Sequence, residues 1–312
     1  MEPIFLSELP NREAQRLVQS GAPVVATFNP VEYHGPHLPL DTDTLLSISA
    51  LKAVFERLRG RSEWPFLIHS VVRAGCGAVP SHGTTQHNYR QVRKIVMNTC
   101  EGIRDLGAKR AILMTFHGEP LHNLAIEDGV KLLQSWGIKA FAPMNVVMNE
   151  ALHYQPVNYK EAIDTIQDLT LREYYRDYLM ADFHGGFFET SLMLHWNPKT
   201  VETDYAQVPP CPPVKNSAFL LQISRIFREF GWDHLARELD FANYGLTWYK
   251  ISPTPGYTGN PGLANETAGR IFAERTTDLI VKAWLDYFEH GVANPRPVLR
   301  WVRPLTLQGR LI

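Results

Sequence analysis

Short apolar runs alternate with amphipathic stretches along the first half of the chain. The runs are rich in β-branched residues and predict strands at 23–28, 65–72, 111–116 and 138–142. The stretches have helical spacing and predict helices at 11–19, 44–59, 89–106 and 121–136. Strands that alternate with helices through short links predict an α/β fold, with a mainly parallel central sheet between two layers of helices.

The second half of the chain has a less regular pattern. Residues 146–180 are rich in tyrosine, asparagine and charge, which predicts either a helical excursion or a lid. The proline-rich segment 207–213 predicts an extended connector, and 264–290 predicts a last amphipathic helix. We expect the arginine-containing arm 294–312 to pack on its own subunit or to reach a neighbouring one. Without an internal repeat or a clear boundary, the chain is expected to form one domain over 1–312.

Composition narrows the class of protein. The chain has 312 residues, of which 45% are hydrophobic, so it can bury a large core and is not expected to be disordered. Its 31 basic and 32 acidic residues give a net charge of −1, which argues against a nucleic-acid partner. Three widely spaced cysteines fit a reducing compartment. We see neither a secretion signal nor an apolar run of about 18 residues, so we expect a cytoplasmic protein without a membrane partner.

The densest group of polar side chains follows the strand predicted at 23–28. Glu32 and His34 are two residues apart, so on an extended segment their side chains point the same way. Glycine and prolines then turn the chain, which can bring Asp41 or Asp43 back to the same place. Carboxylate and imidazole ligands suit zinc, manganese or iron. The alternative is a polar loop with capping aspartates and a surface histidine.

A second pair with the same spacing follows the strand predicted at 111–116. His117 and Glu119 are again two residues apart. With Glu32 and His34 they supply four candidate ligands, and Asp43 is a fifth that could bridge two metal ions. The alternative is that this pair only caps the helix predicted from residue 121.

A third group lies between Asp182 and Ser191. His184 precedes a pair of glycines, where it could act as a general acid or base or donate a hydrogen bond to an oxyanion. Glu189 could orient His184 or support a metal ligand. Alternatively, His184 is a structural histidine bonded to Asp182.

These groups resemble the motifs of the creatininase family of amidohydrolases. The run from Glu32 to Asp43 is similar to its signature Glu-x-His-Gly-Pro-His-Leu-Pro-Leu-x-x-Asp. His117-x-Glu119 resembles its second ligand pair, and the segment from His184 to Ser191 resembles its His-Ala-Gly-x-x-Glu-Thr-Ser element. Matching elements at 83–84 and 256–261 keep the family's order along the chain.

The resemblance implies a dinuclear metal hydrolase with the family's layered α/β/α fold. By this resemblance Glu32, Asp43 and His117 would hold one ion of zinc, manganese or iron. His34, Asp43 and Glu119 would hold the other, with a hydroxide between the two ions as the nucleophile. His184 and Glu119 would be the catalytic residues. Family analogy also implies a homo-oligomer, commonly a hexamer.

Departures from the family pattern argue against creatinine as the substrate. Tyr33 stands where the family has glutamine, Gly118 offers no side chain, and no tryptophan precedes His184 closely. We therefore predict hydrolysis of an amide C–N bond in another small polar cyclic substrate. One alternative is ring opening of an oxidised inositol or another cyclic ketone or lactone, and the other is a metal-binding protein without activity. Four further residues are expected to contact substrate or to support the ligands: Cys76, His82, Asp182 and Glu189. We also assign a supporting position to His37, and expect His87 and His122 to line the cleft.

Overall fold

The computed structural model describes residues 2–61 and 64–310. Its centre is a five-stranded sheet with the order β1-β3-β2-β4-β5, in which all neighbouring strands are parallel. The strands are β1 (Ile4–Phe5), β2 (Val24–Asn29), β3 (Leu67–Arg73), β4 (Arg110–Met114) and β5 (Lys139–Phe141). The predicted α/β fold is therefore confirmed, and the short edge strand β1 is added to it.

Helices cover both faces of the sheet. Alternate side chains of β2 point to opposite faces, so Val24 and Ala26 pack with one set of helices and Val25 packs with the other. The first set is α1 (Asn11–Gln19), α3 (Tyr89–Asp105) and α4 (Pro120–Ser135), and the second is α2 (Thr42–Arg57) and α11 (Glu266–Phe288). All six residues of β2 are buried, as expected for a central parallel strand.

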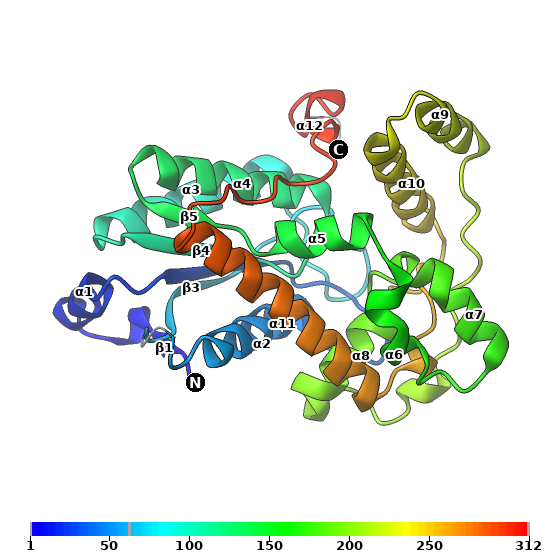
Figure 1. Ribbon diagram of the computed structural model, residues 1–312, viewed down its shortest axis with the longest axis horizontal. Helices are drawn as coiled ribbons and strands as arrows, with labels where there is room; N and C mark the ends of the chain where they lie inside the picture. Colours follow the sequence, from blue (N-terminus) through cyan, green and yellow to red (C-terminus); the bar gives the residue numbers. More distant parts are fainter. Residues whose placement is uncertain (1, 62–63, 311–312) are drawn as a thin grey trace.

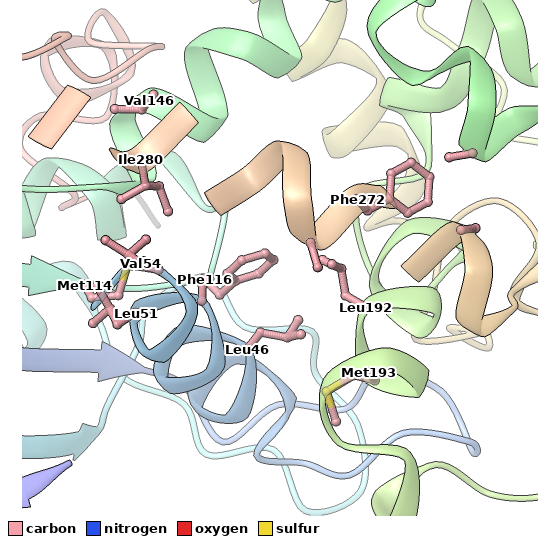
Figure 2. Close-up of a cluster of buried hydrophobic side chains, with 14 of the residues drawn as sticks. Leu46, Leu51, Val54, Met114, Phe116, Val146, Leu192, Met193, Phe272 and Ile280 are labelled. Carbon is pink, nitrogen blue, oxygen red and sulfur yellow. The ribbon is translucent and has the colours of Figure 1, made fainter. Parts of the chain in front are cut away.

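Helix α11 joins the sheet to the second half of the chain. It packs against α2 and against α8 (Phe187–Trp196). Figure 2 shows Phe272 and Leu192 at the contact of α11 with α8, and Ile280 further along α11 on the side of Val54. One continuous hydrophobic core therefore holds α8 and its preceding loop close to the sheet.

Residues 146–180 form a helical excursion, one of the two alternatives predicted for them. They contain most of α5 (Met144–Leu152), then α6 (Lys160–Ile163) and α7 (Leu169–Tyr178). The predicted extended connector then leads to a hairpin of two helices, α9 (Ala218–Glu229) and α10 (Asp233–Trp248). No helix was predicted here, and Figure 1 shows the hairpin beside the main body, with α10 next to α5.

The described part of the C-terminal arm packs on its own chain. Leu299 is buried, and Arg303 at the short helix α12 (Val302–Leu305) pairs with Asp128 of α4 at 2.9 Å. Figure 1 shows α12 in red between α4 and the hairpin. Within the described ranges, no helix is both long and apolar enough to cross a membrane.

Candidate active site

The carboxyl ends of β2 and β4 lie side by side in the middle of the sheet. The chain passes from β2 to β3 on one side and then to β4 on the other, so the strand order reverses here, which is where open α/β sheets bind ligands. Asn29, the last residue of β2, joins the two strand ends. Its Oδ1 accepts hydrogen bonds from Phe116 N and from Ser47 Oγ of α2, both at 3.0 Å.

The loop after β2 brings three of the predicted ligands together. Glu32 Oε1 accepts a hydrogen bond from Val79 N at 2.6 Å, which fixes its carboxylate. Nδ1 of His34 lies 3.0 Å from the carbonyl oxygen of Glu32, so its Nε2 is left to face the site. Asp43 lies in the first turn of α2, and all three side chains are buried.

His117 and Glu189 complete two groups of ligand atoms around Asp43. His117 Nδ1 lies 3.0 Å from Glu32 Oε2 and 3.6 Å from Asp43 Oδ2. His34 Nε2 lies 3.4 Å from Asp43 Oδ1 and 3.8 Å from Glu189 Oε2. Three groups of described residues are compact enough to hold a metal ion. Two of them share Asp43 and are Glu32, Asp43 and His117, and His34, Asp43 and Glu189; the third is Glu32, His34 and His184. Each oxygen of Asp43 belongs to one group.

The buried atoms of this cluster fit divalent metal ions. Within the described chain, His34 Nε2 and Asp43 Oδ2 are buried without a hydrogen-bond partner. Buried polar atoms are normally paired, because an unpaired one loses its hydration without compensation. Imidazole nitrogen and carboxylate oxygen are ligands of zinc and manganese, so metal ions would satisfy both atoms.

The structure places Glu189, rather than Glu119, beside His34 and Asp43. Glu119 belongs to none of the metal-ligand groups found among the described residues. Its Oε2 instead caps α4 by accepting a hydrogen bond from His122 N at 2.6 Å. Burial raises the pKa of Glu189 to about 8, so its ionised form requires a positive charge nearby. Glu189 therefore lies beside His34 and Asp43, at the position where Glu119 was expected, and the ligand role of Glu119 stays a prediction.

His184 lies against the cluster. Its ring stacks on that of His34, with the ring centroids 4.0 Å apart, and its Nε2 lies 3.1 Å from the carbonyl oxygen of Tyr33. The backbone N–H of His184 donates to Thr258 Oγ1 at 3.1 Å. On its other side lies Trp248 of α10, with ring centroids 5.2 Å apart. His184 is therefore held rigidly at the border between the ligand cluster and the hairpin.

The surroundings shift the pKa values of three histidines in opposite directions. Burial lowers the pKa of His34, but the carboxylate of Asp43 outweighs burial and raises the pKa to about 10. Glu32 acts in the same way on His117, against the effect of burial, and raises its pKa to about 10. Burial and the nearby charge of His34 lower the pKa of His184 to about 4. The carboxylates therefore favour cations in the cluster, and His184 is its neutral member.

Two further predicted residues, Cys76 and Asp182, lie at the site with supporting contacts. Cys76 donates from Sγ to Glu119 Oε2 at 3.4 Å, and burial together with Glu119 raises its pKa strongly, so it is a thiol. Asp182 accepts hydrogen bonds from Tyr175 Oη at 2.8 Å and from Phe187 N at 2.9 Å. Both residues also line the cavity that contains the cluster.

Of the other histidines, His82 lies away from the site. It is exposed and does not line the cavity, because the chain turns at 81–84, where Gly83 has a φ of +85° and Thr84 N donates to Ser81 O. The prediction of a substrate contact at His82 is therefore not supported by its position. His37 is buried with its Nε2 2.8 Å from Thr190 Oγ1. His122 was expected to line the cleft, but it is buried beside His117 and does not line the cavity. His87 lines the cavity, as expected.

The contribution of α10 to the site was not evident from the sequence. The cluster opens into a cavity of about 960 Å³, and α10 supplies part of its wall, including Phe241, Leu246 and Trp248. Trp248 lies 64 positions after His184 in the chain, and no motif spacing connects them. The only available signal was the unusual number of aromatic residues between 241 and 249.

Known proteins are similar to this chain in sequence and in fold. The model of the creatininase family, described as creatinine amidohydrolase, matches residues 7–284. Creatinine amidohydrolase of Pseudomonas putida is 31% identical over 209 residues, which cover 64% of this chain and 75% of that protein. The mycofactocin precursor peptide peptidase of Mycobacterium ulcerans (strain Agy99) is 38% identical over 282 residues, 88% of this chain and 90% of that protein.

Solved structures agree with the observed fold. A structure titled creatininase Mn superimposes with a TM-score of 0.60 and 22% identity, covering 92% of this chain and all of that one (100%). Another, a glutamate-to-glutamine mutant creatininase of the Zn-Zn type, has a TM-score of 0.60 and 20% identity over 93% of this chain and 100% of that chain. The shared fold therefore extends over nearly the whole length of this chain and of each of the two solved chains.

Proposed function

The chain belongs to the creatininase family, and we propose that it hydrolyses an amide C–N bond with the help of two divalent metal ions. Family membership makes it a metal-dependent hydrolase of the amidohydrolase type. The observation that carries the proposal of two ions is the position of Asp43, whose two oxygens face two separate groups of buried ligands. A shared carboxylate of this kind is a common feature of paired metal sites.

In this proposal Glu32, Asp43 and His117 hold one ion, and His34, Asp43 and Glu189 hold the other. Bound there, the ions would polarise the substrate carbonyl and lower the pKa of a water molecule to near neutrality. Hydrolysis adds the water across the bond, so the carbonyl carbon gains a hydroxyl group and the nitrogen gains a hydrogen.

His184 is the residue placed to handle the proton in this reaction. It lines the cavity beside the ligand cluster, and its low pKa keeps the imidazole neutral. Its Nε2–H donates to the carbonyl oxygen of Tyr33, so Nδ1 is left to accept a proton from water. The carbonyl oxygen of Tyr33 orients the ring, and the hydroxyl of Thr258 holds the backbone of His184 by accepting from its N–H. Asp182 holds the backbone that follows His184, through Phe187 N.

The identity of the metal ions, the assembly and the location are proposed from related proteins. Manganese and zinc are named in the titles of similar structures, and the chain's imidazole and carboxylate ligands suit both, so we propose these two metals. A homohexamer and a cytoplasmic location also remain proposals. Mass photometry on the purified protein tests the assembly: a particle six times the mass of the 35.5 kDa chain is expected, and a monomer would contradict it.

The decisive experiment measures the metal content per chain in the wild type and in three matched variants. Plasma mass spectrometry of protein purified without chelator should find close to two ions per chain. Glu189→Gln should leave about one, whereas Glu119→Gln should keep two, because only Glu189 lies beside His34 and Asp43. The exposed Glu274→Gln serves as the control and should match the wild type. Protein that takes up neither manganese nor zinc would overturn the proposal.

Product analysis tests the bond that is cleaved. Creatinine and short peptide amides are incubated with the metal-loaded protein, and mass spectrometry records the gain of one water and a new N–H group. We expect this gain with at least one amide and its loss on His184→Ala. Hydrolysis confined to cyclic ketones or lactones would favour the ring-opening alternative. Bound metal without turnover of either class would favour a binding protein.

A further inference from the structure

The cavity extends well beyond the space that a small ring needs. Its volume of about 960 Å³ is near the upper end of the range of about 300–1,000 Å³ for small-molecule pockets. Large apolar side chains contribute to its lining, and we call five of them the apolar wall. It consists of Met148 of α5, Phe241 and Leu246 of α10, and Trp301 and Leu305 of the C-terminal arm.

Aromatic side chains connect the apolar wall to the ligand cluster without interruption. The ring of His184 is 5.2 Å from that of Trp248, which is 5.6 Å from the ring of Phe183. Phe183 in turn lies 5.3 Å from Phe241 of the wall. A molecule whose reacting group reaches the cluster can therefore place another part against the wall.

Two members of the wall are exposed at this cavity. Leu246 and Leu305 keep 57% and 68% of their surface accessible to solvent, although both line the cavity. Exposed apolar side chains grouped around a concave site commonly mark a ligand-binding surface, because a ligand removes them from water. The wall is therefore suited to an apolar ligand.

The charges of the lining limit the kind of ligand. Among the described lining residues there is no lysine or arginine. The acidic residues of the lining are Glu32, Asp43, Glu119, Asp182 and Glu189, all of them at the ligand cluster or beside His184. A carboxylate or phosphate held at the wall would lose its hydration without gaining a cationic partner. The wall therefore favours an uncharged group.

We propose that the apolar wall binds an uncharged apolar group, aromatic or branched aliphatic, carried by the amide substrate. The inference rests on the proposed function, because the scissile amide would lie at the ligand cluster. It also replaces the expectation of a small polar ring, since such a substrate would leave the wall in contact with water. Phe241, Leu246 and Trp301 are then specificity-determining residues.

A matched pair of hydroxamates tests the proposal without knowledge of the substrate. Acetohydroxamate and 3-phenylpropionohydroxamate share a metal-binding head and differ in the apolar tail. Calorimetry on the manganese- or zinc-loaded protein should show the phenyl compound binding about tenfold tighter or more, because its tail removes apolar surface from water. Equal affinities of the two compounds would overturn the proposal.

Variants locate the effect on the wall. Gly245 of α10 lines the cavity, and a Cβ there would meet only Phe183, at 4.0 Å, so Gly245→Leu has room to fill the space. This variant should remove the preference for the phenyl compound, and Phe241→Ala should reduce it. Phe230→Ala is the matched control, because Phe230 is exposed on the same hairpin and does not line the cavity. A preference unchanged in Gly245→Leu would contradict the proposal.

A neutral fluorescent probe separates the failure of this inference from the failure of the proposed function. N-phenyl-1-naphthylamine needs no metal and brightens in apolar surroundings. It should bind to chelated and to metal-loaded protein alike, and Gly245→Leu should weaken this binding. If neither hydroxamate binds but the probe does, the proposed metal centre is contradicted and the proposed apolar binding surface is supported. If the two hydroxamates bind equally and the probe does not bind, the proposal that the apolar wall binds an apolar group is contradicted.

Discussion

Asp182 shows how one buried carboxylate can hold the segments around His184 together. Its oxygens accept hydrogen bonds from Tyr175 Oη, from Phe187 N and Phe188 N, and from Asn260 N, at 2.8 to 3.3 Å. The chain approaches so closely at Gly259 that a Cβ there would overlap the carboxylate. Asp182 therefore joins α7, the start of α8 and the loop at 259–260.

Asp182→Asn is expected to destabilise the protein. The amide keeps one acceptor oxygen and turns an NH₂ group toward backbone donors, so at least one buried N–H loses its partner. Such a loss costs about 1–3 kcal/mol of the free energy of unfolding, which urea denaturation can measure. Asp164→Asn, at a partly exposed ion pair on α6, is the control. A change within about 0.5 kcal/mol, typical of surface sites, would contradict the assigned role.

At the residue scale, the sequence could identify candidate ligands but not their partners. The proximity of Glu32, His34 and His117 was predictable because they follow strands whose carboxyl ends meet in a parallel sheet, and their role as ligands stays a prediction. The choice between Glu119 and Glu189 depends on where the loop before α8 lies, and packing of α8 against α11 decides that. Spacing along the chain contains no information about such a contact.

Glu238 of α10 fixes the C-terminal arm to the helical hairpin. It is buried, and its two oxygens accept hydrogen bonds from Leu299 N at 2.6 Å and Trp301 Nε1 at 2.8 Å. Leu299 has a φ of 58°, a conformation that costs energy for a residue other than glycine. The hydrogen bond to Glu238 offsets this cost, and it places Trp301 in the cavity wall.

Glu238→Ala should release the arm. Two buried donors lose their acceptor, so the free energy of unfolding is expected to fall by about 1–3 kcal/mol. Limited trypsin digestion should then cut faster after Arg300, because local opening exposes the backbone there. Glu229→Ala, on the exposed end of α9, should leave the digestion rate unchanged. If trypsin digests the arm of Glu238→Ala no faster than that of the wild type, other contacts hold the arm.

At the scale of helices and strands, the elements that are buried in the core were the ones that the sequence predicted. Strand β2 was evident because both of its faces are covered, which requires a continuous apolar run. Helices α9 and α10 were not predicted, although the apolar residues of α9 recur with helical spacing. The two helices pack mainly on each other rather than on the sheet, and several of their large apolar side chains, such as Phe219 and Leu246, remain exposed.

At the scale of the whole molecule, the metal centre links folding to pH. Several carboxylates surround His34 and His117, and they raise the pKa of each imidazole from the ordinary 6.5 to about 10. Without metal, the two protonated rings supply the positive charge that the carboxylates require. A metal ion must displace these protons, because imidazole binds metal only in its neutral form. Protons and metal ions therefore compete for the same site.

The competition predicts opposite pH trends for metal-free and metal-loaded protein. The raised pKa values mean that the folded metal-free chain binds more protons than the unfolded chain between about pH 6.5 and 10. Stability contributed by these histidines is complete below pH 6.5 and is lost as the pH rises through this window, so the Tm of chelated protein should fall from pH 6.5 to 9. With manganese or zinc added, binding strengthens as protons leave, so the difference in Tm between loaded and chelated protein should widen over the same range.

Differential scanning fluorimetry across this range measures both trends. His34→Gln removes one of the two imidazoles whose pKa is raised, so its chelated form should show a shallower fall in Tm than the wild type. His290→Gln is the matched control, because His290 lies beyond the end of α11, far along the chain from every ligand, and it should reproduce the wild-type slope. A chelated protein whose Tm is flat or rises from pH 6.5 to 9 would contradict protonated imidazoles in the metal-free site.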